Sequence, residues 1–114
     1  MVIRNVDQGD IIRMDFDPQT GREQKGRRPA IVISNSTFNR LTRTAAIVCP
    51  ITNTNKDFPF HVKLDGRTST TGVILCDQVK AFDIHARNFE FIERAPDDIL
   101  AEVFNIVSGF IEVI

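Results

Sequence analysis

The chain has few of the residues that build a covalently cross-linked or metal-stabilised fold. Its 114 residues include only two cysteines, Cys49 and Cys76, and two histidines, His61 and His85. The cysteines are too few and too far apart for a disulfide framework or a zinc knuckle, and both lie in apolar runs, so we expect reduced core residues. Neither histidine lies near a cysteine or an acidic cluster at ligand spacing. We therefore expect no metal site and no cofactor.

Long apolar segments are absent as well. No run reaches the roughly 18 apolar residues that a membrane span needs, and charges occur throughout the first 20 residues. Neither a transmembrane helix nor a signal peptide is readable, which predicts a cytoplasmic location. A hydrophobic content of 42% in 114 residues is enough for one core. We expect a single domain covering residues 1–114.

The net charge of −1 conceals an uneven distribution of charge. Residues 1–43 hold eight Lys and Arg against five Asp and Glu, whereas residues 90–114 hold six acids and one base, Arg94. A basic face, if the fold has one, is therefore built by the N-terminal part. The global charge neither supports nor excludes a nucleic-acid partner.

The most cation-dense stretch lies in a polar loop between two predicted strands. Three of the four residues from 25 to 28 are basic, and two carboxylates, Asp17 and Glu23, lie close by in the sequence. Such a loop is either a salt-bridged surface hairpin or a site for an anionic substrate. Charge alone favours the hairpin, because charge runs are usually solvated faces.

Short strands dominate the first ninety residues. Alternating or continuous apolar runs predict strands over residues 11–16, 29–34, 45–51, 58–64, 72–76, 78–82 and 89–92. Residues 72–82 form either one long strand bent at Asp77 or two consecutive strands, and Pro50 requires an edge, a bulge or a strand end. A polar connection over residues 35–42 carries capping residues and is expected to form a single helical turn.

The hydrophobic period changes at the C-terminus. From Pro96 onward, apolar residues recur at the i, i+3, i+4 spacing of a helix, with Pro96 suited to its first position and Asp97 and Asp98 to its positive end. The apolar residues after Asn105 indicate either a buried end or a dimer contact. The predicted fold is mainly β, a small bent sheet or barrel of five to seven strands with a C-terminal α-helix.

Two common catalytic motifs are missing. The sequence has no Gly-x-Ser-x-Gly nucleophile elbow and no phosphate-binding P-loop. What remains is the chemistry of cations, hydroxyls and carboxylates, which suits phosphodiester transfer in RNA.

Five motifs occur in one order along the chain. They are Gly9-Asp10-Ile-Ile-x-x-Asp15-Phe16-Asp17-Pro18, Gly21-x-Glu23-Gln24-x-Gly26-x-Arg28-Pro29-Ala30, Cys49-Pro50-Ile51-Thr52, Phe58-Pro59-Phe60 and Asp77-Gln78-Val79-Lys80. In this order they resemble the MazF/PemK family of toxin endoribonucleases from type II toxin–antitoxin systems, and the resemblance covers roughly residues 9–107.

The resemblance implies a fold and an activity. The fold is an SH3-like barrel with a C-terminal helix, of the PemK/CcdB-like kind, that works as a homodimer. The implied activity is cleavage of single-stranded RNA or mRNA at short sequences without metal, which inhibits translation and growth. It also implies a cognate antitoxin whose disordered C-terminal tail covers the RNA groove.

The family's catalytic residues fall on identifiable positions. Its catalytic arginine corresponds to Arg28 and its catalytic threonine to Thr52. Attack by the ribose 2′-hydroxyl creates a phosphorane with added negative charge, which a guanidinium matches bidentately. Arginine is normally protonated, so it is a poor general base. Glu23 is an easier proton acceptor, but orienting Arg28 is an equally good interpretation of its role.

Further residues are expected to bind RNA. The candidates are Asp17, Lys25, Arg27, Lys56, Asp77, Gln78 and Lys80. Gln78 is expected to read a base edge, with a plain strand-turn role as the alternative, while solvated lysine is the commoner explanation for Lys56 and Lys80. Phe16 and Phe38 offer rings for stacking, although Phe16 fits the core better.

Two other functions are compatible with the same fold. One is a non-enzymatic toxin that poisons a topoisomerase such as DNA gyrase through its C-terminal helix, against which the presence of Arg28 and Thr52 argues. The other is an inert RNA-binding barrel. The cleavage sequence is not readable, because base choice depends on loop conformation.

Overall fold

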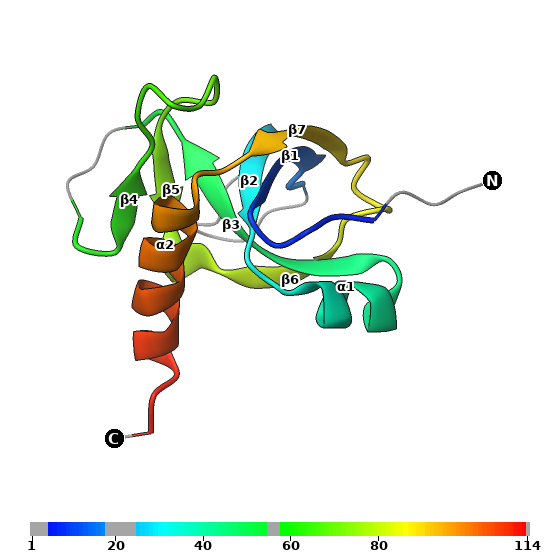
Figure 1. Ribbon diagram of the computed structural model, residues 1–114. Helices are drawn as coiled ribbons and strands as arrows, with labels where there is room; N and C mark the ends of the chain where they lie inside the picture. The colour runs from blue at the N-terminus through cyan, green and yellow to red at the C-terminus, as the bar shows by residue number, and fades with distance from the viewer. Residues whose placement is uncertain (1–4, 18–24, 55–57, 114) are drawn as a thin grey trace.

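The computed structural model describes residues 5–17, 25–54 and 58–113. Its elements run β1 (Asp10–Asp15), β2 (Arg27–Val32), α1 (Ser36–Thr42), β3 (Ala45–Thr52), β4 (His61–Lys63), β5 (Val73–Leu75), the 3₁₀ turn η1 (Cys76–Gln78), β6 (Lys80–Asp83), β7 (Glu90–Arg94) and α2 (Asp97–Phe110). Figure 1 shows α2 standing beside β4 and β5, away from α1. The predicted succession of strands followed by a C-terminal helix is confirmed.

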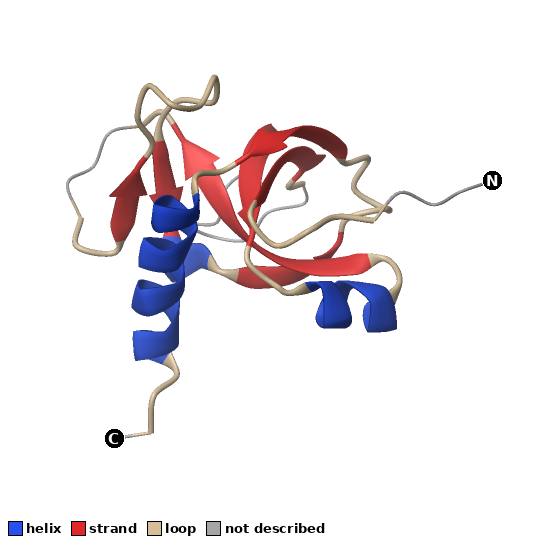
Figure 2. Ribbon diagram, viewed as in Figure 1, coloured by secondary structure: helices blue, strands red, loops and turns tan. Residues whose placement is uncertain are grey.

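Seven antiparallel strands form one strongly bent sheet. The strand order is β4-β5-β3-β2-β1-β7, and β6 pairs with β3 off this path. Among the described residues no ladder joins β4 to β7, so the sheet curls without closing (Figure 2). The mainly β fold class with its C-terminal helix is confirmed, and within this class the sheet stays open.

The bent sheet buries a cluster on each face. One cluster lies between the sheet and α2 and contains the helix residues Ile99, Val103 and Val107. The other lies on the opposite face of the sheet and contains Met14 and Phe16. Phe16 is therefore a core residue, as its pattern predicted, and does not offer a stacking face.

Cys49 and Cys76 are both buried and free, as predicted. A hydrogen bond with the Cys76 thiol and burial together raise the pKa of the Cys49 thiol, so it is held as an inert, protonated core residue.

Pro50 lies inside β3, but at a place that tolerates a missing donor. The ladder with β6 ends at the pair Val48 and Lys80, and the ladder with β5 begins at the pair Ile51 and Ile74. On this edge of β3, Pro50 thus falls between two ladders, a place that tolerates the absent N–H, while on the other edge it pairs with Ala30 of β2.

Some predicted boundaries shift. The strand expected over residues 58–64 is ordered as β4 over only three residues, because the chain at Phe58 and Phe60 turns and the backbone N–H of His61 donates to the carbonyl of Phe58. The polar connection forms a seven-residue helix, α1, whose N-cap Asn35 accepts from the backbone N–H of Phe38 at 3.0 Å. Pro96 stands one residue before α2, as its N-cap.

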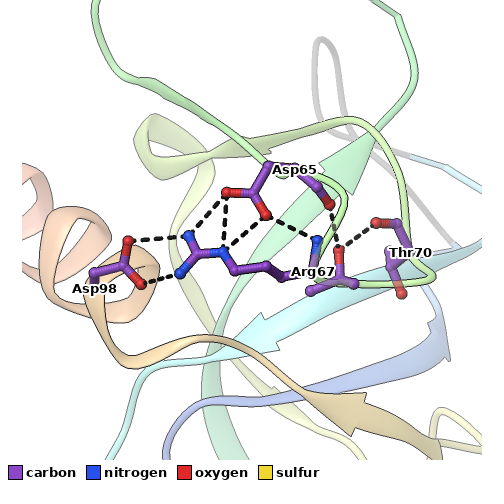
Figure 3. A network of polar contacts seen from close by, with 5 residues as sticks. Asp65, Arg67, Thr70 and Asp98 are labelled. Atoms are coloured by element: carbon purple, nitrogen blue, oxygen red, sulfur yellow. Dashed lines mark hydrogen bonds and ion pairs between the residues drawn. The ribbon is translucent and has the colours of Figure 1, made fainter.

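The loop between β4 and β5 is tied to α2 by one arginine. The Arg67 guanidinium donates to Asp65 of the same loop and, at 2.8 and 3.0 Å, to both carboxylate oxygens of Asp98 in the first turn of α2 (Figure 3). The hydrogen bond from Arg67 lowers the pKa of Asp65 to about 2. The bidentate geometry fixes the loop's direction as well as its position.

A second tie joins the same loop to β7. The Glu93 carboxylate accepts four hydrogen bonds of 2.7–3.0 Å, from the backbone N–H and hydroxyl groups of Ser69 and Thr70. Burial raises the pKa of Glu93, but the hydrogen bonds from Thr70 and Ser69 outweigh it and bring the pKa to about 2. The two ties together hold the segment that leads into β5.

In the described part of the chain, neither helix is long and apolar enough to cross a membrane.

We expect removal of buried bulk from the interface between α2 and the sheet to destabilise the fold. Ile99 is 4% exposed, so Ile99→Ala should lower the free energy of unfolding by about 2–5 kcal/mol. Leu41→Ala is the matched control, because Leu41 is 79% exposed on α1 and should lose far less. Equal losses in urea unfolding would contradict the assignment of this core.

Glu93 should make stability depend on pH. A carboxyl whose pKa is lower in the folded state stabilises the fold above its ordinary pKa of about 4.3, and this contribution disappears as pH falls toward 2. At pH 7 the free energy of unfolding of wild type should exceed that of Glu93→Gln by on the order of 1 kcal/mol. The difference is small because the carboxylate is only partly shielded from water.

Denaturant unfolding at several pH values tests the role of the Glu93 charge. The difference between wild type and Glu93→Gln in denaturant unfolding should shrink steadily between pH 5 and pH 3. Glu102→Gln, on the exposed side of α2, is the control and should track wild type throughout. A difference independent of pH would show that the Glu93 charge does not hold the loop.

Candidate active site

The cation-rich loop is closed at its base by main-chain and side-chain hydrogen bonds. The backbone N–H of Phe16 donates to the carbonyl of Gly26 at 2.9 Å, and the N–H of Gly26 donates to the Asp17 carboxylate at 3.0 Å. Gly26 has a φ of 76°, a left-handed conformation that favours glycine. Asp17, expected to bind RNA, here closes the loop. Glu23, between these two ends, lies outside the described residues.

Arg28 lies on β2, half-buried, with its side chain on the face that Ala30 and Val32 share. Its Nε donates to the carbonyl of Lys25 at 3.0 Å, which orients the guanidinium while leaving its two terminal nitrogens for a ligand. Within the part of the chain that the structure describes, no carboxylate forms an ion pair with Arg28. A half-buried guanidinium without such a partner is suited to an anion.

Arg27 differs from its neighbour because strand residues alternate in direction. It points to the other face of β2, where its guanidinium lies 3.2 Å from Asp15 and 3.6 Å from Glu90. A hydrogen bond from Asn88, followed by one from Arg27, lowers the pKa of the Asp15 carboxyl. The structure thus separates the two adjacent arginines, and the RNA-binding role of Arg27 stays a prediction.

Thr52 ends β3, two residues beyond the last pair of the β2–β3 ladder. The ladder of β2 with β3 pairs Ala30 with Pro50, and continuing that antiparallel register by two residues places Arg28 opposite Thr52. Opposed residues project from the same face, so the two predicted catalytic side chains share one surface. Thr52 is 5% exposed, and its hydroxyl accepts from the backbone N–H of Thr54 at 3.2 Å.

The other edge of β3 brings β5 against Thr52. Gly72 precedes β5 with a φ of 116°, and a Cβ there would lie 2.3 Å from the carbonyl oxygen of Thr52. The hydroxyl of Thr71 donates to the side-chain oxygen of Asn53 at 2.9 Å. Only glycine allows this close approach, so the loop held by Arg67 and Glu93 forms the back wall of the site.

A small cavity opens beside this wall. It has a volume of about 210 Å³, and its lining residues are Thr52, Asn53, Lys63, Leu64, Gly72 and Val73. Sequence reasoning missed most of this set. The alternation over residues 58–64 places Lys63 on the wet face of its strand, but no sequence signal shows that this strand lies near Thr52.

Asp77 and Gln78 lie in η1, directly after β5. The Asp77 carboxylate is 3.7 Å from Nε2 of His61, and the His61 ring packs beside Phe58 with 5.3 Å between the ring centroids. Phe58 also meets Phe60 at 5.2 Å, and both rings are exposed to solvent. Exposed aromatic faces beside hydrogen-bonding groups are suited to unstacked bases.

Lys80 does not line the cavity beside Thr52. It begins β6, and its ammonium sits over the Phe82 ring, 5.3 Å from the centroid. It lines a second, mostly apolar groove of about 430 Å³ together with Phe104 and Ile111 of the C-terminal region. Lys25 is exposed at the loop base, and Lys56 lies outside the described residues. The RNA-binding roles of these three lysines stay predictions.

Comparison with known proteins agrees with the motifs. Residues 7–110 match the family model of the PemK-like, MazF-like toxin of type II toxin–antitoxin systems. The chain is 38% identical over 108 residues to the endoribonuclease PemK of Escherichia coli, covering 91% of this chain and 80% of that protein. It is 47% identical over 88 residues to the endoribonuclease toxin MazF of Escherichia coli K12, covering 76% and 78%.

Solved structures show the same fold. A crystal structure of MazF from Deinococcus radiodurans superimposes with a TM-score of 0.90 at 36% identity, covering 96% of this chain and 98% of that one. A MazE-MazF structure from the same organism gives a TM-score of 0.81 at 37% identity, covering 93% and 95%. On sequence and on fold, this chain belongs to the PemK-like, MazF-like toxin family of type II toxin–antitoxin systems.

Proposed function

We propose that this protein is the toxin of a type II toxin–antitoxin pair and that it cleaves single-stranded RNA in the cytoplasm without a metal ion. The observation that carries the proposal is the β2–β3 register, which pairs Ala30 with Pro50 and, continued by two residues, sets Arg28 on the same face as Thr52. Thr52 in turn lines an open cavity. The names of its relatives, which are endoribonucleases, support the same activity.

The chemistry follows from the charge that develops on the scissile phosphate. The ribose 2′-hydroxyl gives its proton to a base and attacks the adjacent phosphorus. The P–O5′ bond breaks as the leaving O5′ takes up a proton from water, and the products carry a 2′,3′-cyclic phosphate and a 5′-hydroxyl. The Arg28 guanidinium, oriented by the carbonyl of Lys25, donates to the equatorial oxygens as their charge grows. Thr52 donates its hydroxyl to the same phosphate while its own oxygen is held by Thr54.

The proton acceptor has to be a group other than a protonated guanidinium. Arginine has a pKa above about 12, so Arg28 is assigned to charge stabilisation. Glu23, in the same loop, is the proposed base or the residue that orients Arg28. A carboxylate has the acceptor lone pairs that the first role needs.

A cognate antitoxin is the proposed protein partner. The MazE-MazF structures of Deinococcus radiodurans, at 37% and 35% identity to this chain, support such a partner. We place the antitoxin's disordered C-terminal tail over the RNA groove, where it excludes substrate. The apolar end of α2 is exposed in the single chain, with Phe110 40% and Ile111 78% accessible, which favours a homodimer contact over a buried end.

The activity is tested first by removing the guanidinium. Purified wild-type protein should cut single-stranded RNA in excess EDTA, and Arg28→Ala should reduce the rate about 10²–10³-fold because a donor to the developing charge is lost. Arg28→Lys should recover little, because an ammonium lacks the planar fork. Arg40→Ala, on the exposed side of α1, is the control and should cleave as wild type does.

The outcomes separate the proposed function from its alternatives. Product ends without a 2′,3′-cyclic phosphate, or activity that EDTA abolishes, would contradict the mechanism. Binding of RNA without any change in its length would indicate an inert RNA-binding protein. Growth arrest that survives Arg28→Ala but is lost on changes in α2 would indicate a topoisomerase poison.

A further inference from the structure

Lys63 lies in the same cross-strand row as the catalytic pair. The ladder of β4 with β5 pairs Lys63 with Val73, and the ladder of β3 with β5 pairs Val73 with Thr52. Residues directly opposite one another in antiparallel strands project from one face. The row therefore runs Lys63, Val73, Thr52 and, through the continued register with β2, Arg28. Its two ends are cations, and the candidate site for the scissile phosphate lies at the end formed by Thr52 and Arg28.

Lys63 is also open to solvent and not neutralised. It is exposed on the edge strand, and in the described ranges no carboxylate lies within ion-pair distance of its ammonium. Arg67, the next cation along the chain, is by contrast held by both Asp65 and Asp98. An ammonium group without an ion-pair partner at a strand edge attracts an anionic ligand.

The spacing along the row suits an RNA backbone. Neighbouring strands lie about 4.8 Å apart, so Lys63 and Thr52 are separated by two such steps, roughly 10 Å at the backbone. The cavity of about 210 Å³ between them is lined by both residues. A phosphate held at Arg28 and Thr52 leaves the next phosphate of the strand over this cavity, within reach of the flexible lysine side chain.

Acidic groups around this position have other partners, and Asp65 is held by Arg67. The Asp77 carboxylate lies 3.7 Å from Nε2 of His61. His61 is on the same strand as Lys63, two residues earlier. The pair of Asp77 and His61 and the β4–β5 loop lie on opposite sides of the row. Glu93, which holds that loop, accepts hydrogen bonds from Ser69 and Thr70.

We propose that Lys63 binds a backbone phosphate of the RNA next to the scissile phosphate and so sets the path of the strand across β5. The inference rests on the proposed function for the identity of the anion. Lys63 acts on binding and alignment. It contacts no reacting atom. Because its contact is to the phosphate backbone, its effect is independent of base sequence.

The experiment uses the salt dependence that a phosphate contact creates. Each neutralised phosphate of a single strand contributes about 0.7 to the slope of log affinity against log salt. Cleavage of a long single-stranded RNA transcript is followed under kcat/KM conditions over a series of NaCl concentrations. Lys63→Gln should lower kcat/KM at low salt and reduce the magnitude of the slope by about 0.7.

Two controls make the slope specific. Lys63→Arg keeps the positive charge and should restore the wild-type slope. Arg40→Gln removes one positive charge from the exposed face of α1, away from the row, and should leave the slope unchanged. An unchanged slope for Lys63→Gln, or an equal change for Arg40→Gln, would overturn the inference.

A binding measurement keeps this test separate from the proposed function. Fluorescence anisotropy of a labelled single-stranded 2′-O-methyl RNA, which lacks the attacking 2′-hydroxyl, gives the binding slopes without any cleavage. If wild type fails to cleave, the proposed function is contradicted, whereas the Lys63 contact still stands or falls on the binding slopes. If wild type cleaves and Lys63→Gln matches it at every salt concentration, only the Lys63 contact is wrong.

Discussion

Two antiparallel registers meet at Thr52, and the candidate site depends on both. On one edge of β3, the pairing of Ala30 with Pro50 carries Arg28 to the position opposite Thr52. On the other edge, the pairing of Thr52 with Val73 brings β5 and the loop before it against the same residue. A slip of one residue in either ladder would turn the site's side chains to the opposite face. The buried Ile31 and Ile51, which pack beneath, make such a slip costly.

The wall behind Thr52 depends on a similar constraint at a smaller scale. Gly72 touches the carbonyl of Thr52 so closely that no other residue fits without a shift of the backbone. The loop that delivers Gly72 is long, and ordering it costs conformational entropy. Charge-assisted hydrogen bonds offset this cost. Arg67 donates to Asp98 of α2, and Glu93 of β7 accepts from Thr70 of the loop. Residues remote from the cavity thus determine its shape.

Hydrophobic period and turn residues were sufficient to predict the strands, the bend at Asp77 and the C-terminal helix. They failed at β4, where alternation suggested a longer strand than forms, because Phe58 and Phe60 pack with each other across a turn. The motif resemblance predicted Arg28 and Thr52 as catalytic residues, and the β2–β3 register, continued by two residues, places them on one face. The phosphate contact proposed for Lys63 was not readable from the sequence, because a sequence does not show which strands pair across a sheet. Arg27 and Arg28 carry the same charge, but neighbouring residues of a strand point to opposite faces, and this alternation places them on different sides of β2.

The central claim is that Arg28 and Thr52 act on one phosphate. A double-mutant cycle of Arg28→Ala and Thr52→Val, read as single-turnover RNA cleavage, tests it directly, since valine removes the hydroxyl at nearly constant volume. If the two groups act as a unit, the double variant will be scarcely slower than Arg28→Ala alone. Rate losses that multiply, as they do for independent sites, would contradict the account.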